Sequence, residues 1–317
     1  MEIKKKSPSL FAIVVLYNGM TNNWIQKCFS SLQDSSLTNT IIAIDNNSSD
    51  KSCAFIKENF PKVHLIASSE NLGFGKANNI GIKYAIKNNA DFVFLLNQDA
   101  WVDSDTIQNL VLKLSQSPDF GILSPMHLNG NGSALDLSFS RSIAPQYCPD
   151  LYSDFYLEKV QDKIYEADFI CAAAWLISRE CLKKVGGFNP TFYHYGEDDN
   201  YVHRLHFHGF KIGVLPTCKI YHDRENRPIN DKFENRHYIE RNQYLLNISN
   251  PHSNITTAGA IKHLQILLLK SFLKLNLKKP RQIQKLLKFL KSNKQEIDNN
   301  LNISVKELFS FLQDNNG

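Results

Sequence analysis

Short apolar runs alternate with amphipathic stretches along the first hundred residues of this chain. The runs are continuous and end at polar or turn-forming residues, which is typical of strands buried on both faces of a parallel sheet. The pattern predicts strands at residues 11–16, 40–44, 63–67 and 92–96, and helices at residues 23–32, 51–59 and 77–87. An α/β fold with a doubly covered, mostly parallel, Rossmann-like sheet is therefore expected.

The remainder of the chain changes character twice. The pattern predicts a helix at residues 103–117, a strand at 120–124, a long loop at 129–165, an apolar run at 168–177 and a short helix at 179–185. Beyond Pro251 the pattern is helical, and a capping box from Ser304 to Glu307 predicts the start of a last helix. We therefore divide the chain into a body, residues 1–250, and a helical tail, residues 251–317.

The composition fits a globular protein whose charge is unevenly distributed. The chain has 317 residues, of which 43% are hydrophobic, and a formal net charge of +5. The tail carries 11 Lys and Arg against 4 Asp and Glu, whereas the body carries 25 against 27. A nucleic-acid-binding body would need a basic stripe within the same domain, so we expect no nucleic-acid partner.

The cysteines and the apolar runs both favour a cytoplasmic protein. The six cysteines are scattered and form no Cys-x-x-Cys pair, which predicts reduced thiols rather than a zinc or redox site. The apolar run at residues 10–16 follows Lys4 to Lys6, as in a signal peptide, but it is short and lacks a small-residue cleavage site. The nearest approach to a membrane span, residues 261–277, is interrupted by three lysines.

Polar residues follow the predicted strands at the points where a parallel sheet binds its ligands. They are Tyr17-Asn18, Asp45 to Ser48, Glu70-Asn71 and Asn97 to Asp99. Asp45 with its two asparagines suits either a tight turn or a contact to a nucleotide. Asp99 suits either a helix cap or the binding of a divalent cation that a diphosphate carries.

Three adjacent carboxylates, Glu197, Asp198 and Asp199, follow a Gly-Gly-Phe turn and stand between aromatic residues. Like charges this close together shift one another's pKa values, and such an environment can produce a general base. The alternative is an acidic first turn that complements the helix dipole. The sequence alone supports both interpretations.

Five motifs, taken in order, resemble those of the family 2 glycosyltransferases, the inverting GT-A group that includes bacterial polysaccharide rhamnosyl-, galactosyl- and glucosyltransferases. The motifs are Val-Leu-Tyr17-Asn18, Ile-Asp45-Asn-Asn-Ser48-x-Asp50, Asn71-x-Gly73-Phe74-Gly75 with Asn79 and Gly81, Leu-Leu-Asn97-Gln98-Asp99, and Gly186-Gly187-Phe188 followed by Gly196-Glu197-Asp198. The resemblance covers residues 10–250. It implies a GT-A domain with a nucleotide-sugar half, residues 1–102, and an acceptor half, residues 103–250, followed by a C-terminal helical extension.

The resemblance also implies roles for single residues. Asp198 would be the general base, with Glu197 beside it in the catalytic site. Asp99 and His222 would hold Mn²⁺ or Mg²⁺, although Asn97 replaces the first acid of the family's Asp-x-Asp motif. Asp45 would face the base and ribose of the donor, and Arg204 would shape the catalytic site. The full set of implied donor-binding residues is Tyr17, Asn18, Asp45, Asn47, Asn71, Gly73, Phe74, Asn79, Asn97, Gln98, Asp99 and Arg204.

The implied reaction is sugar transfer from a dTDP- or UDP-linked donor to a lipid-linked oligosaccharide in bacterial surface polysaccharide synthesis. The Gln98-Asp99 pair resembles rhamnosyltransferases and favours rhamnosyl transfer over galactosyl, glucosyl or N-acetylhexosaminyl transfer from UDP. A nucleotidyltransferase is a second class, but it should carry a basic, glycine-rich loop after the first strand, which Tyr17 to Met20 do not provide. A non-catalytic nucleotide-sugar-binding module is a third class, which Asn97 favours and the Glu197-Asp198 pair disfavours.

The tail carries lysines at helical spacing. Lys262, Lys270, Lys274 and Lys278 recur at multiples of four, with leucines on the other side. This pattern predicts basic amphipathic helices that rest peripherally on the anionic inner face of the cell membrane. The alternative is a helix that packs on the body and leaves its lysines in solvent. The sequence makes no prediction of the oligomeric state.

Overall fold

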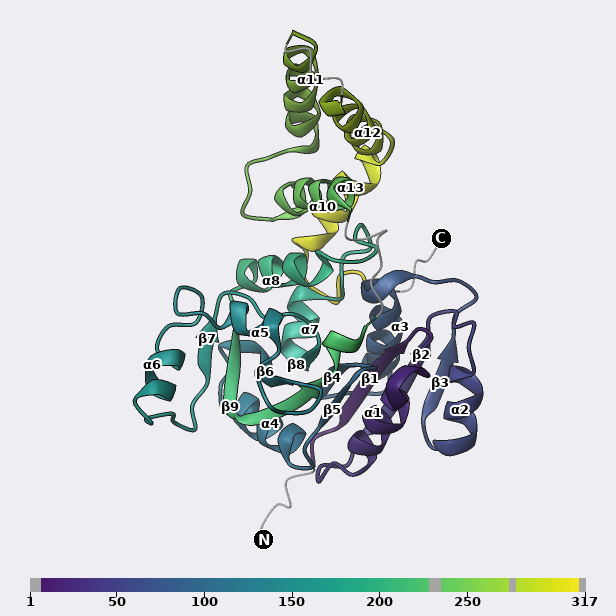
Figure 1. Cartoon of the computed structure of the whole chain (residues 1–317), viewed down its shortest axis with the longest axis vertical. Coiled ribbons are helices and arrows are strands. Elements are labelled where there is room, and N and C mark those ends of the chain that lie inside the picture. Colours follow the sequence, from purple (N-terminus) through teal and green to yellow (C-terminus); the bar gives the residue numbers. More distant parts are fainter. Residues whose placement is uncertain (1–6, 228–234, 274–277, 314–317) are drawn as a thin grey trace.

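The computed structural model describes residues 7–227, 235–273 and 278–313, which form a sheet covered by helices and a separate group of C-terminal helices (Figure 1). Within these residues the sheet has nine strands in the order β3-β2-β1-β4-β8-β6-β9-β5, and β7 pairs with β9. The strands are β1 (Leu10–Leu16), β2 (Thr40–Asp45), β3 (His64–Ala67), β4 (Phe92–Asn97), β5 (Ala100–Val102), β6 (Phe120–Asn129), β7 (Tyr165–Ala167), β8 (Ala174–Ser178) and β9 (Lys211–His222). Strands β1 to β4, β6 and β9 share one direction, and β5, β7 and β8 run the other way. The mostly parallel α/β sheet expected from the sequence is confirmed.

Hydrophobic side chains pack on both faces of this sheet. Ile13 belongs to a cluster beneath α3, α7 and α8, whereas its neighbour Val14 belongs to a cluster beneath α1 and α4. Because successive residues of a strand point to opposite faces, complete burial of both explains why β1 reads as a continuous apolar run. The helices of the body are α1 (Trp24–Gln33), α2 (Ser52–Asn59), α3 (Gly73–Lys87), α4 (Thr106–Ser115), α5 (Leu137–Ser142), α6 (Leu151–Tyr156), α7 (Arg179–Val185) and α8 (Glu197–Phe207).

The middle of the chain differs from the sequence prediction in three places. The strand expected at residues 120–124 continues to Asn129, because β9 pairs with β6 along this whole length. Residues 129–165 are not one loop, since they include α5 and α6, and Asp136 caps α5 by accepting the N–H of Phe139. The apolar run at residues 168–177 forms a strand, β8, only from Ala174 onward, and β8 is antiparallel to both β4 and β6.

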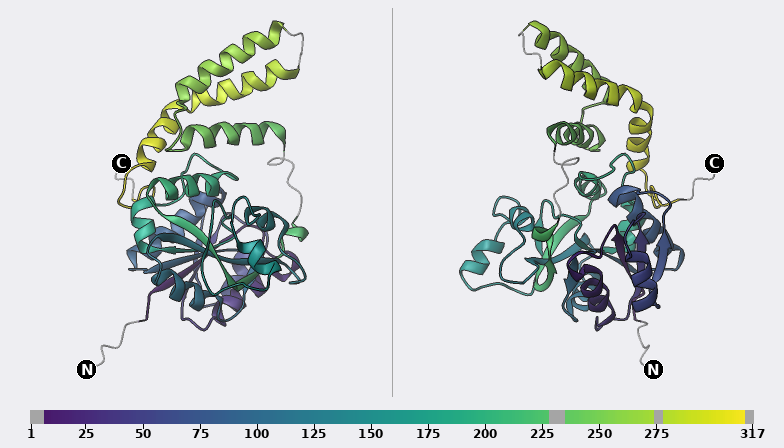
Figure 2. Two further views of the ribbon diagram at one scale, coloured as in Figure 1. Left: turned by 90° about the vertical axis from the view of Figure 1, so that its left-hand side faces the viewer. Right: turned by 45° about the vertical axis from the view of Figure 1, so that its right-hand side comes forward.

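In the part of the chain that the structure describes, four α-helices follow β9 and pack together at one end of the body (Figures 1 and 2). They are α10 (Arg236–Ser249), α11 (Thr257–Leu273), α12 (Lys278–Ser292) and α13 (Lys294–Ser304). Leu245, Leu264, Leu290 and Ile297, one from each helix, share a hydrophobic cluster with Phe192 of the body. Helix α10, which ends at Ser249, therefore packs against helices on both sides of the boundary placed at residue 250. No helix in the described part of the chain is long and apolar enough to cross a bilayer.

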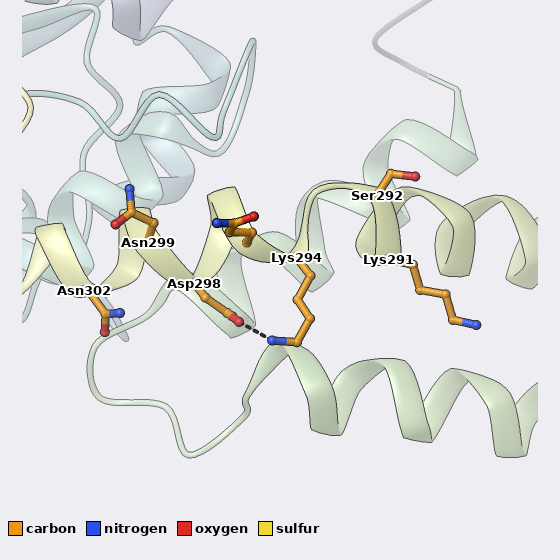
Figure 3. A pocket seen from close by; sticks show the side chains of 7 residues that line it. Lys291, Ser292, Lys294, Asp298, Asn299 and Asn302 are labelled. Atoms are coloured by element: carbon orange, nitrogen blue, oxygen red, sulfur yellow. Dashed lines mark hydrogen bonds and ion pairs between the residues drawn. The ribbon is translucent and has the colours of Figure 1, made fainter. Parts of the chain in front are cut away.

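Helices α11 and α12 form a hairpin that projects away from the body (Figure 2). At its base, Lys294 pairs with Asp298 in the first turns of α13, as Figure 3 shows. Thr257, at the start of α11, donates a hydrogen bond to the same carboxylate. The start of the hairpin is thus bonded to α13, which follows the end of α12 at Ser292.

The chain returns to the body after α13, which corrects the helix start expected at Ser304. Ser304 is the last residue of α13, and its hydroxyl donates to the carbonyl of Leu301 in the preceding turn. Beyond it, the carbonyl of Ser310 accepts the N–H of Gly187 at 2.8 Å, and Leu312 joins the core of the body. Ser304 therefore ends a helix and does not begin one, because the residues that follow it contact the body.

Candidate active site

A cleft of about 340 Å³ lies at the carboxyl ends of β1 and β4. This is the edge at which a parallel sheet binds its ligands. Eight of its lining residues are donor-binding residues expected from the sequence: Tyr17, Asn18, Asn71, Gly73, Phe74, Asn97, Gln98 and Asp99. The lining is completed by Val15, Thr21, Trp24, Asn46, Tyr193, His194, Tyr195 and Arg227.

Gln98 joins the two loops that form one wall of the cleft. Its Oε1 accepts the N–H of Tyr17 at 2.9 Å, and its Nε2 donates to the Tyr17 carbonyl at 3.0 Å. These two bonds continue the pairing of β1 with β4 past the last strand residues. The Gln98 side chain therefore fixes the backbone of Tyr17 and Asn18 at the mouth of the cleft.

An asparagine network builds the opposite wall, at the start of α3. Asn46 accepts the N–H of Leu72 at 2.7 Å, and Asn71 accepts the N–H of Gly73 and the hydroxyl of Tyr193, at 3.0 and 3.1 Å. Gly73 has φ +77°, and a Cβ there would lie 1.9 Å from the carbonyl oxygen of Tyr193. The close approach of these two backbones requires glycine at this position.

Asp45 ends β2 next to the cleft-lining Asn46, does not itself line the cleft, and is almost fully buried. Its Oδ2 accepts the N–H of Ser48 at 3.1 Å, which is the turn expected from the sequence. Its Oδ1 is buried and has no hydrogen-bond partner within the described residues. Buried carboxylate oxygens are rarely left unpaired, so this atom can accept a donor from a ligand. Asn47 is exposed with φ +63° and does not line the cleft.

Asp99 and His222 meet at one end of the cleft, and both side chains are buried. Oδ1 of Asp99 lies 3.5 Å from Nε2 of His222. On the far side of the ring, Nδ1 of His222 lies 3.3 Å from Oδ2 of Asp136, at ion-pair distance but without hydrogen-bond geometry. A carboxylate behind the imidazole is the usual arrangement at metal-binding histidines, and here Nε2 faces Asp99.

Arg227 fills the space between these two groups. Its Nη2 donates to Oδ1 of Asp99 at 2.7 Å and lies 2.8 Å from Nε2 of His222, and its Nε donates to Oδ2 of Asp99. Although burial raises the pKa of Asp99, Arg227 and His222 hold that pKa well below its usual range. The Asp99 carboxylate is therefore ionised, and it already contacts a cation.

The Asp99 and His222 side chains suit a divalent cation only in part. Among the described residues, no group of three or more His, Cys, Asp or Glu is placed to hold a metal ion. Asn97, at the position of the missing first acid, has its Nδ2 3.5 Å from Nε2 of His222. Because Mn²⁺ and Mg²⁺ usually take about six ligands, diphosphate and water oxygens would have to complete the shell.

The three adjacent carboxylates form the first turn of α8, after Gly196 with φ +91°. Burial raises the pKa of Glu197 and of Asp198, and burial together with Asp198 raises the pKa of Asp199 to about 7. A helix N-terminus favours ionised carboxylates, so the raised pKa values mean that desolvation outweighs the dipole here. Oε2 of Glu197 is buried without a hydrogen-bond partner in the described part of the chain.

Neither Glu197 nor Asp198 lines the cleft itself. Asp198 lies within electrostatic range of Arg224, which lowers its pKa against the larger effect of burial. Nε of Arg224 lies 3.3 Å from Oδ2 of Asp136, the carboxylate behind His222. Arg224 and Asp136 thus connect the surroundings of Asp198 with the Asp99–His222 pair.

Two expected donor-binding residues lie away from the cleft and brace the Gly186-Gly187 turn. Asn79 makes two bonds with the backbone of Phe188, at 2.7 and 2.8 Å. Arg204 is fully buried and donates to the carbonyls of Val185 and Gly187. Their polar atoms contact this turn in the ligand-free structure, and a contact of either side chain with the donor stays a prediction.

Several lining residues were missed by the sequence interpretation. Arg227 follows His222 by five residues, and Arg224 by two, so two cations next to the expected metal ligand were a usable signal. Trp24 donates from Nε1 to Asp223 at 2.7 Å, a contact between distant segments that no local pattern indicates. His194 and Tyr195 belong to the aromatic segment before α8 and are held through their carbonyls by Asn242 of α10.

The family of the chain follows from comparison with known proteins. The model of glycosyl transferase family 2 matches residues 11–186, which is more than half of the chain. The chain therefore belongs to family 2 of the glycosyltransferases, which confirms the resemblance seen in its motifs. A second model, the N-terminal domain of galactosyltransferase, matches residues 159–226.

Curated relatives are similar at low identity. The low-salt glycan biosynthesis hexosyltransferase Agl10 of Haloferax volcanii is 25% identical over 213 residues, which is 64% of this chain and 66% of the relative, just under two thirds of its length. The dTDP-rhamnosyl transferase RfbF of Shigella flexneri is 22% identical over 247 residues, which is 75% of this chain and 79% of the relative.

Solved structures share the fold. TarS of S. aureus, in complex with UDP, aligns with a TM-score of 0.54 at 15% identity over 92% of this chain and 89% of its own. The mannosyltransferase PcManGT of Pyrobaculum calidifontis, in complex with GDP-Man and Mn²⁺, aligns with a TM-score of 0.51 at 18% identity over 92% and 88%. The GT-A fold expected from the sequence is thereby confirmed.

Proposed function

We propose that this protein transfers a sugar, with inversion at the anomeric carbon, from a nucleotide-diphosphate sugar to a lipid-linked oligosaccharide in surface polysaccharide synthesis. The observation that carries the proposal is the cleft at the carboxyl ends of β1 and β4. There, fixed amide side chains stand beside an ionised carboxylate that already contacts a cation.

The donor is expected to lie between the Tyr17–Asn18 loop and the start of α3. Oδ1 of Asp45, next to the cleft-lining Asn46, has no hydrogen-bond partner among the described residues, and an imide N–H of uracil or thymine is a donor that matches it. A dTDP-rhamnose donor is our first choice, supported by the Gln98-Asp99 pair and by the name of the Shigella relative. A UDP-hexose donor is the alternative.

Asp99 and His222 would hold Mn²⁺ or Mg²⁺ together with the donor diphosphate. When bound, such a cation neutralises charge on the departing nucleoside diphosphate. Asp136 would keep the His222 ring oriented for this task, since it lies 3.3 Å behind the ring.

Asp198 is proposed as the general base, with Glu197 beside it. The acceptor hydroxyl oxygen bonds to C1 of the sugar as the bond from C1 to the diphosphate oxygen breaks, and the hydroxyl proton passes to the Asp198 carboxylate. Because burial raises the pKa of Asp198, its carboxylate is a stronger base than an exposed one. Inverting transfer needs no protein nucleophile.

A screen of donors tests the proposed function directly. Thermal unfolding is measured with UDP-, dTDP- and GDP-sugars, each with and without Mn²⁺, because a ligand that binds only the folded state raises the unfolding temperature. We expect selective stabilisation by a dTDP- or UDP-sugar, followed by its turnover when an acceptor is supplied. Absence of stabilisation by every nucleotide sugar would count against transferase function, and binding without turnover of any kind would favour a non-catalytic module.

The α11–α12 hairpin is proposed as the contact with the membrane that carries the acceptor. From residue 241 to 295 the sequence has no Asp or Glu, while residues 257–295 contain ten Lys and Arg. On α11, Lys262, Ile266, Leu269 and Lys270 follow helical spacing along one exposed stripe, and Leu269 is 68% exposed. Two of the expected basic residues are not placed here: Lys274 lies outside the described residues, as does the side chain of Lys278.

Removing charge from the hairpin is expected to release the protein from anionic vesicles. A lysine near an anionic surface contributes about 1 kcal/mol, so a fourfold Lys→Gln variant should lower partitioning by up to about 10³-fold at low salt. The measurement is sedimentation with phosphatidylglycerol vesicles at low and high salt. The residues to change are the exposed Lys262, Lys270, Lys285 and Lys288.

A matched control removes four charges from exposed lysines of the body instead. Equal loss of binding in both variants, or binding that salt does not weaken, would remove the membrane role and leave the hairpin as a packed extension. The control residues are Lys51, Lys57, Lys62 and Lys159.

A further inference from the structure

We propose that Arg227 is an internal cation that holds the place of a divalent metal between Asp99 and His222 until the donor binds. The inference rests on the proposed function in one respect only, namely that a nucleotide diphosphate is the ligand that displaces the guanidinium. Its first consequence, weak metal binding by the ligand-free protein, needs no donor.

The guanidinium and a metal ion would compete for the same atoms. Both oxygens of Asp99 accept hydrogen bonds from Arg227, and Nη2 of Arg227 lies 2.8 Å from Nε2 of His222. A donor N–H facing Nε2 means that this nitrogen presents its lone pair, which is the state that a metal ligand requires. A cation seated at Asp99 and His222 must therefore displace Arg227.

The local charge balance favours the arginine when no donor is present. Asp99 is 2% exposed, and a buried carboxylate without a counter-charge is strongly unfavourable. With Asn97 in place of a second acid, the described residues of the cation site carry one negative charge, that of Asp99, which one guanidinium neutralises. The nearby Asp136 carboxylate is balanced separately by Arg224, 3.3 Å away.

Donor binding reverses this balance. A nucleoside diphosphate brings at least two further negative charges into the cleft, which a single guanidinium cannot offset. Arg227 is 34% exposed and lines the cleft, so its side chain can turn from Asp99 toward phosphate oxygens without crossing the core. Metal and donor should therefore bind with positive coupling, each raising the affinity for the other.

The test is Mn²⁺ binding to the full chain without nucleotide, measured from the electron paramagnetic resonance signal of free Mn²⁺. Arg227→Gln is expected to bind Mn²⁺ at least about tenfold more tightly than the wild type, because the competing cation is gone. Arg227→Lys should stay near the wild type, since the ammonium group can still contact the carboxylate. In the presence of UDP or dTDP, the difference between wild type and Arg227→Gln should narrow.

Two further variants locate the effect. Lys219→Gln removes a cation that pairs with Asp103 away from the cleft, and its Mn²⁺ affinity should match the wild type. Adding Asp99→Asn to Arg227→Gln should abolish the gained affinity. Equal affinities of wild type and Arg227→Gln, tight binding by the wild type, or no binding by either protein would each overturn the proposal. Failure of every nucleotide sugar to bind would instead refute the proposed function.

Discussion

Replacing Asp198 by asparagine is expected to lower the rate of sugar transfer by about 10²- to 10⁴-fold while leaving donor binding nearly unchanged. The amide keeps the shape of the side chain and its place in the first turn of α8, but it cannot take the acceptor proton. Burial raises the pKa of Asp198, so the wild-type rate should fall as the pH drops through that pKa, and the variant should lack this acid limb. Steady-state kinetics across pH, with donor affinity measured separately, checks both expectations.

The neighbouring Asp199 supplies the matched control. Burial and Asp198 raise its pKa from 3.8 to about 7, so the folded wild type binds an extra proton in this interval and loses stability as the pH rises through it. Asp199→Asn should escape that loss and keep its transfer activity. A near wild-type rate in Asp198→Asn, or equal loss in both variants, would contradict the assignment of Asp198 as the base.

Asp99→Asn is expected to lower kcat/KM for the donor by about 10²- to 10³-fold, which corresponds to about 3 to 4 kcal/mol of transition-state stabilisation. The change removes the one carboxylate that the described residues supply to the cation site, so charge on the leaving diphosphate is less well neutralised. Kinetics at several Mn²⁺ concentrations measures the effect, and the thermal unfolding temperature reports whether the fold survives. The amide is isosteric, and the 34% exposure of Arg227 allows water to reach the unpaired guanidinium.

Asp103→Asn is the control for this prediction. Asp103 follows β5, is 37% exposed and lies 3.4 Å from Lys219, away from the cleft. Its replacement should change neither kinetics nor metal dependence. Unaltered turnover by Asp99→Asn, or full wild-type activity in excess chelator, would remove Asp99 from the proposed cation site.

The sequence predicted the part of the site that depends on regular structure. Asn18 and Asp99 follow β1 and β4, Asn97 ends β4, and neighbouring parallel strands carry such residues to a common edge. Apolar periodicity identified those strands, so the position of the cleft followed from local pattern. Asp45 was placed by the same reasoning, and the structure adds that one of its oxygens lacks a hydrogen-bond partner among the described residues.

The remainder of the site depends on contacts between segments that are distant in the sequence, which the sequence pattern did not predict. Arg227 pairs with Asp99, 128 positions earlier, and Asn79 binds the backbone of Phe188, 109 positions later. Motif position indicated that Asn79 and Arg204 belong near the site, but only the folded chain shows that both brace a turn. Which distant polar atoms meet is decided by how α3, α7 and α8 pack, and a one-dimensional pattern does not contain that packing.

The return of the chain after α13 has a consequence for the order in which the protein becomes active. A Cβ on Gly186 would lie 2.0 Å from the carbonyl oxygen of Ser310, and Gly187 donates to that same oxygen, so the turn before α8 is completed by a segment more than a hundred residues downstream. Contacts of such long range form late, because the intervening chain must first be made and ordered. During synthesis, the strands around the cleft can assemble before Ser310 contacts the Gly186-Gly187 turn that precedes α8. The α11–α12 hairpin lies between the strands of the cleft and Ser310 in the sequence. Each chain that completes the Gly186-Gly187 turn therefore already contains the hairpin that we propose as the membrane contact.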